Sequence, residues 1–233
     1  MRAVILLGLN VARAQWIAVA VMLAYLLGIA QVFRMHAHPS DVLFFLRWHA
    51  GYALFLSMGL TAPVLQVERK SRRILAVLSK GIHRWQYLGG FLCGSTIIAA
   101  LFSGLIGAIA GWLCRETGAP SDALIPVTLA LFCCSVAAAA TGLLFAVFLH
   151  PFLATLASSV VLSLPLFLEP LGYSPGWRIF PAAWMIHFLL SFKFLPTGKE
   201  IWEISAAALC QIVVFWMIAA AIFSRRDVTI SPE

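Results

Sequence analysis

Several apolar runs of 18 residues or more constrain this chain more than any other feature of its sequence. A helix needs roughly 20 mostly apolar residues to cross the hydrocarbon core of a bilayer, which is about 30 Å thick. The composition, 62% hydrophobic and 11% charged, agrees with membrane spans rather than with soluble domains. Ten-residue segments of alternating polarity, typical of a transmembrane barrel, are absent. The sequence therefore predicts an all-α polytopic membrane protein.

Charged residues and Pro or Gly breaks divide the apolar sequence into six predicted spans. They cover about 15–33, 43–66, 86–112, 124–149, 152–169 and 203–223. The first 15 residues, MRAVILLGLNVARAQ, predict an interfacial amphipathic helix on the cytoplasmic face, with a cleaved signal peptide as the alternative. The apolar run at 179–192 is too short to cross a bilayer, so one or two short re-entrant outer helices are predicted at about 174–195, before the last span.

The distribution of basic residues predicts the orientation. If the N-terminus is cytoplasmic, the inner segments carry ten of the sixteen Lys and Arg residues and the outer segments carry six. Such an excess is typical of cytoplasmic loops. We therefore expect both termini to be cytoplasmic in a multi-pass protein of the plasma (bacterial inner) membrane. Because the net charge of +7 has this explanation, membrane lipids are expected partners and nucleic acid is not.

The segment 67–85 gathers charge that the rest of the chain avoids. It holds six of the basic residues, namely Arg69, Lys70, Arg72, Arg73, Lys80 and Arg84. As a helix, 68–85 places an apolar stripe beneath those charges, made of Ile74, Leu78, Ile82 and Trp85. One interpretation is an amphipathic helix facing anionic lipid at the inner surface. Glu68, at its start, would either pair with a basic group of a partner or cap its own helix, since helix N-termini favour negative charge.

This region resembles the membrane subunits of type-two ABC exporters, which have six spans per subunit. The resemblance is carried by the acidic residue and basic-apolar run ERKSRRILAVL, and by the short turn and Arg84 that lead into the third span. Gly81 stands where that family usually has a turn proline. The resemblance implies that residues 1–233 form one transmembrane permease domain, and that 67–85 is a coupling helix that docks in a groove of a separate ATPase.

The partners and site residues follow from the same resemblance. The ATPase-coupling residues would be Glu68, Arg69, Arg72, Arg73, Leu78, Lys80, Ile82 and Arg84. The chain has no G-x-x-x-x-G-K-[ST] motif, so ATP and magnesium are expected on an ABC ATPase subunit pair. We predict no catalytic residue, metal site or cofactor in this chain. Six spans form half of such a transporter, which implies a second copy or a paralogous permease.

Ionisable residues in or beside spans are the usual functional candidates in membrane proteins. Arg47 and His49, near the outer end of the second span, and His187, in the outer segment, are predicted to contact the substrate pathway. Two other classes stay open. One is a secondary carrier, which would have charged or unwound sites near the midplane, where this chain is mostly apolar. The other is a non-transporting scaffold or maturation subunit, which would have no such sites. The substrate is not indicated.

Small residues in two of the predicted spans indicate close helix packing. They are Gly90, Gly94, Gly104, Gly107 and Gly111 in the third span, and Ala137–Ala140 in the fourth. Small side chains let helix backbones approach one another in a membrane. We therefore expect both spans to lie against neighbouring helices at these positions.

Overall fold

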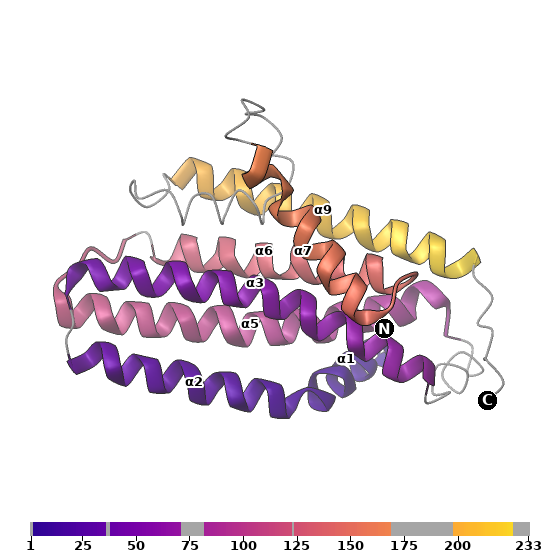
Figure 1. Cartoon of the computed structure of the whole chain (residues 1–233), viewed down its shortest axis with the longest axis horizontal. Helices are drawn as coiled ribbons and strands as arrows, with labels where there is room; N and C mark the ends of the chain where they lie inside the picture. Colours follow the sequence, from indigo (N-terminus) through magenta and orange to yellow (C-terminus); the bar gives the residue numbers. More distant parts are fainter. Residues whose placement is uncertain (1, 36–37, 71–81, 123, 169–197, 226–233) are drawn as a thin grey trace.

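The structure is a computed structural model of the chain, and it describes residues 2–35, 38–70, 82–122, 124–168 and 198–225 (Figure 1). These ranges contain no strand, so the predicted all-helical class is confirmed for them. Their helices are α1 (Arg2–Ala14), α2 (Trp16–Met35), α3 (Pro39–Lys70), α5 (Arg84–Thr117), α6 (Leu124–Ala146), α7 (Pro151–Leu168) and α9 (Gly198–Arg225).

Five of these helices are long and apolar enough to cross a membrane: α2, α3, α5, α6 and α9. They coincide with five of the six predicted spans. The fifth predicted span, 152–169, corresponds to α7, whose apolar part Pro151–Ser163 is shorter than the others. The outer helices predicted at 174–195 lie outside the described residues.

Three helices, α3, α5 and α9, are longer than their predicted spans, and α3 and α5 are the longest of the described helices. α3 and α5 contain 32 and 34 residues, which at about 1.5 Å per residue gives roughly 48 and 51 Å. The hydrocarbon core is only about 30 Å thick. Both helices therefore continue past their apolar segments into charged sequence at their ends.

The helix α6 is the centre of the bundle. It packs against α3, α5, α7 and α9, and Figure 1 shows it running between them along the length of the molecule. In its most apolar window 78% of the residues are buried, against 11% for α2. Ala137–Ala140 are fully buried, so the close packing predicted for this part of the chain is confirmed.

The helix ends meet at two opposite ends of the bundle. α3 ends, α5 begins and α9 ends at one side of the view in Figure 1, where α1 also lies. The turn between α5 and α6 lies at the other side. The end at which α3 ends and α5 begins is called the basic end below, because the described residues of the basic segment 67–85 lie there.

The N-terminal helix α1 packs against the first turns of α5. A Cβ atom on Gly94 would lie 2.8 Å from the carbonyl oxygen of Gly8, and one on Gly90 would lie 2.6 Å from the side chain of Leu7. Glycine is required at these positions because any larger residue would push α1 away. The opposite face of α1 exposes the apolar side chains Ile5, Leu6 and Leu9.

Replacing Gly94 by alanine tests this contact. We expect Gly94→Ala to lower the free energy of unfolding by about 1–3 kcal/mol, the usual cost of overpacking, and to lower the thermal midpoint in detergent. Gly104→Ala is the matched control on the same helix, because nothing lies within 4 Å of its Cβ position. Equal midpoints for the two variants would contradict the close approach of α1.

Candidate coupling surface and membrane groove

The predicted coupling loop begins and ends in long helices. Glu68 and Arg69 lie in the last turn of α3, and Arg84 is the first residue of α5. Ile82 lies just before α5 and is half-buried. The remaining predicted coupling residues, Arg72, Arg73, Leu78 and Lys80, lie outside the described residues.

The position of Glu68 corrects one prediction. Its carboxylate is near the C-terminus of α3, not in the first turn of a separate helix. A helix C-terminus carries partial negative charge and favours cations. The interpretation that Glu68 caps a new helix is therefore wrong, and pairing with a basic group is the alternative that stays open.

A local signal places the beginning of α5. The side chain of Gln86 accepts a hydrogen bond of 3.1 Å from the backbone N–H of His83, and the backbone N–H of Tyr87 donates to the carbonyl of His83. The first amide groups of a helix lack partners within the helix. The Gln86 contact fixes the chain direction at the point where the segment 67–85 passes into α5.

Arg84 joins this point to the last helix. Its guanidinium donates to the carbonyl oxygens of Phe223 and Ser224, at 3.2 and 3.1 Å. Both carbonyls belong to the last turn of α9, and a cation is favoured at the C-terminus of a helix. A residue predicted to contact an ATPase thus also holds two helices of its own chain together.

Aromatic side chains surround this junction. Tyr87 is fully buried and stacks on Phe223 of α9, with ring centroids 6.3 Å apart. Trp85 meets Trp216 of α9 edge-on at 6.0 Å. Sequence reasoning placed Trp85 on an apolar stripe but missed its partners, because nothing local pairs a residue near position 85 with one near position 220.

Two of the three predicted substrate-pathway residues, Arg47 and His49, lie in the described part of the chain, and these two do not share a site. Arg47 and His49 are two residues apart on α3 and therefore point in nearly opposite directions. His49 is only 3% exposed; its Nδ1–H donates to the carbonyl of Phe45 at 2.7 Å, and its ring faces Tyr25 of α2. Arg47 is half-buried, and His187 lies outside the described residues. His49 is thus a packing residue between α2 and α3.

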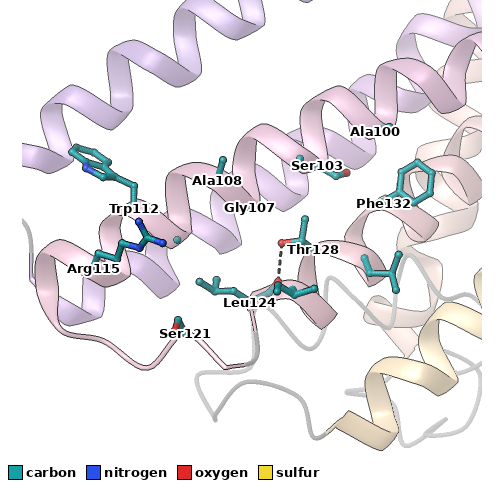
Figure 2. A pocket seen from close by; sticks show the side chains of 14 residues that line it. Ala100, Ser103, Gly107, Ala108, Trp112, Arg115, Ser121, Leu124, Thr128 and Phe132 are labelled. Atoms are coloured by element: carbon teal, nitrogen blue, oxygen red, sulfur yellow. Dashed lines mark hydrogen bonds between the residues drawn. The ribbon is translucent and has the colours of Figure 1, made fainter.

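A groove of about 790 Å³ opens between α5 and α6, at the end of α5 opposite Arg84 (Figure 2). The two helices approach closely at Gly107, whose Cβ would lie 2.6 Å from Oγ1 of Thr128. Gly104 and Gly111 have nothing within 4 Å of their Cβ positions. The packing predicted for the glycines of α5 is therefore confirmed at Gly107 and at the two that meet α1, whereas Gly104 and Gly111 form the floor of the groove.

Ser103 and Arg115 are two of the polar side chains that line this groove, together with Ser121 and Thr128. Ser103 is 1% exposed, and within the described part of the chain its hydroxyl has no hydrogen-bond partner. In Figure 2 this hydroxyl points toward the side of the groove formed by Phe132. Arg115 is exposed at the mouth, and Figure 2 shows its guanidinium directed back along α5 toward Gly107. Long side chains on a helix lean toward its N-terminus, which explains this direction.

The described residues offer no metal centre, since no three His, Cys, Asp or Glu side chains among them gather closely enough to hold an ion. No known family model matches the chain, and no curated protein is significantly similar to it. The function is therefore inferred from the residues of this chain.

Removal of the Arg84 guanidinium tests the α5–α9 junction. We expect Arg84→Ala to speed amide hydrogen exchange in the last turn of α9 and to lower the free energy of unfolding by about 1 kcal/mol, because hydrogen bonds from a partly exposed charged group are of that order. Arg13→Ala is the control, since Arg13 is exposed in the last turn of α1. Unchanged exchange in α9 would show that the junction does not depend on Arg84.

Proposed function

We propose that this chain is the permease subunit of an ATP-driven ABC exporter, and that it couples to a separate ATPase pair through the segment 67–85. The proposal begins from the resemblance of this segment to the coupling region of such subunits. The observation that carries it is the junction at the basic end. The segment directly joins α3 and α5, and Arg84 attaches the last turn of α9 to the same place.

This junction suits the transmission of force. A displacement of the segment 67–85 would act directly on α3 and α5, and through Arg84 on α9. All three helices pack against α6. Helices in a packed bundle move as rigid bodies rather than deforming continuously. Closure of an ATPase pair against this segment would therefore turn several spans together, while ATP and magnesium stay in the ATPase.

The proposal includes a specific topology with six spans, of which α7 is the fifth. In this topology the protein lies in the bacterial inner membrane with both termini on the cytoplasmic side, and α1 lies at the membrane interface. The basic residues support this orientation, because the described helix ends at the basic end carry Arg69, Lys70, Arg84 and Arg225. At the other end of α5, Arg115 is accompanied by Glu116 and Asp122. An excess of Lys and Arg marks the cytoplasmic side.

A second copy or a paralogous permease completes the transporter in this proposal. The exposed face of α2 supports it. Trp16, Ile17, Val21, Leu27 and Val32 are each between 54% and 65% exposed. Such a surface suits lipid or another membrane helix.

The coupling role is tested in the complex with the candidate ATPase. We expect Glu68→Ala combined with Arg72→Glu to lower both recovery of the complex and its ATP turnover by about tenfold or more, because truncating charged contacts at an interface typically costs 2–5 kcal/mol. Lys199→Gln, exposed at the opposite end of the bundle, is the charge-matched control, because it and the double variant each lower the net charge by one. Unchanged recovery and turnover in the double variant would reject coupling through this segment. Lost recovery with unchanged turnover would favour a scaffold.

The two ends of α9 test the orientation. After replacement of the five native cysteines, Lys199→Cys and Arg225→Cys are each exposed to a membrane-impermeant maleimide in intact spheroplasts. We expect labelling of Lys199→Cys from outside and of Arg225→Cys only after permeabilisation, because basic residues gather at the Arg225 end. The reverse pattern would overturn the proposed topology.

A further inference from the structure

We propose that the groove between α5 and α6 binds one zwitterionic phospholipid from the leaflet opposite the basic end. Its floor is made of small residues that leave room for an acyl chain, at Ala100, Gly104, Ala108 and Gly111. A cation stands at its mouth, and a buried hydroxyl without a partner among the described residues lines it. The assignment does not depend on ATP-driven transport.

The length of the groove fits one lipid. From Ala100 to Arg115 is fifteen helical steps, or roughly 22 Å. One leaflet of a bilayer contributes about 15 Å of hydrocarbon, and the headgroup region adds about 5–7 Å. A lipid with its headgroup at Arg115 and its chain over Gly104 would therefore fill the groove from the membrane surface to near the midplane.

Arg115 and Ser103 are spaced for a phospholipid. The Arg115 guanidinium leans over the turn that precedes it, near the level of Gly111. Ser103 lies eight residues further along α5, or about 12 Å. The phosphate and an ester carbonyl of a glycerophospholipid are joined by a few bonds of about 1.5 Å, a reach of roughly 8 Å, and a hydrogen bond of about 3 Å extends each end. Arg115 can therefore bind the phosphate while Ser103 donates to the carbonyl.

The charges around the mouth select the headgroup. Glu116 follows Arg115, Asp122 follows the groove residue Ser121, and both carboxylates are exposed. Arg115 attracts a phosphate, since guanidinium and phosphate form charge-assisted hydrogen bonds. The two carboxylates repel a headgroup with a net negative charge and attract an ammonium group. An amine-bearing zwitterion matches this arrangement better than phosphatidylglycerol does.

A helix from a second copy is the competing occupant, because Ala100, Gly104 and Ala108 recur every four residues, as in membrane helix pairs. In a symmetric pair the same residues meet one another. Arg115 would then face its own copy across the contact. Because like charges repel, and because the guanidinium lies over the groove in Figure 2, the lipid is the better match.

Native mass spectrometry of the purified protein, titrated with phosphatidylethanolamine or phosphatidylglycerol of equal chain length, tests the assignment. We expect one phosphatidylethanolamine to be retained per chain, with affinity lowered about tenfold by Arg115→Gln. Lys199→Gln, at the same end of the bundle, is the control and should bind as the native chain does. Glu116→Gln with Asp122→Asn should bring the two lipids to equal affinity, a result that a non-selective annular lipid would not give.

Blocking the groove gives a second measurement. Gly104→Phe should abolish retention of the lipid, while Gly28→Phe, on α2 and also with nothing near its Cβ position, should not. If the Arg115→Gln and Gly104→Phe variants both retained as much phosphatidylethanolamine as the native chain does, the proposal would be overturned. Dissociation of a dimer by Gly104→Phe would also overturn it, because the groove would then be a contact between copies.

Discussion

The hydrocarbon core of a bilayer offers no hydrogen-bond partner to the peptide backbone, and this constraint shapes every described span. Each unpaired N–H or C=O group there would cost several kcal/mol, so the chain crosses as continuous helix. Hydroxyl side chains obey the same constraint. Ser57, Thr61, Thr141 and Ser158 each donate to the carbonyl four residues earlier, at 2.6–2.9 Å. Among the described residues, Ser103 and Ser135 depart from this pattern, and of these two only Ser103 lines the groove.

Helices in lipid gain little from hydrophobic burial against one another, so small residues and a few polar contacts hold them together. Thr61 meets Ser95 at 3.2 Å, joining α3 to α5, and Gln211 donates to Thr141 at 3.1 Å, joining α9 to α6. Gln15 donates to the carbonyl of Leu60 at 2.7 Å. Each contact fixes the register of one segment against another, and the Gln211–Thr141 contact does so for α9 against the central helix α6. The groove lies where the small residues of α5 have no such neighbour.

The two proposals meet on α5. Arg84 begins this helix at the basic end, and Arg115 stands near its other end, beside the groove. A helix of this length moves as one body, so a displacement applied to the segment 67–85 would also move the wall of the groove. A lipid bound there would in turn favour whichever arrangement of α5 and α6 accommodates it, because a ligand shifts an equilibrium by its difference in affinity for the two states.

The sequence by itself determined the helical class and the approximate positions of five long apolar helices, because apolar length is a local property. It placed α2 to within about two residues, but it missed the extensions of α3, α5 and α9 into charged sequence. Charged residues continue a helix as readily as they end an apolar run. Only the tertiary structure decided which glycines pack and which line a groove. Gly94 and Gly104 look alike in sequence, yet one meets α1 and the other meets nothing. The guanidinium of Arg84 likewise donates to carbonyl oxygens 139 and 140 residues away. Such a contact arises from how helices dock rather than from any pattern along the chain.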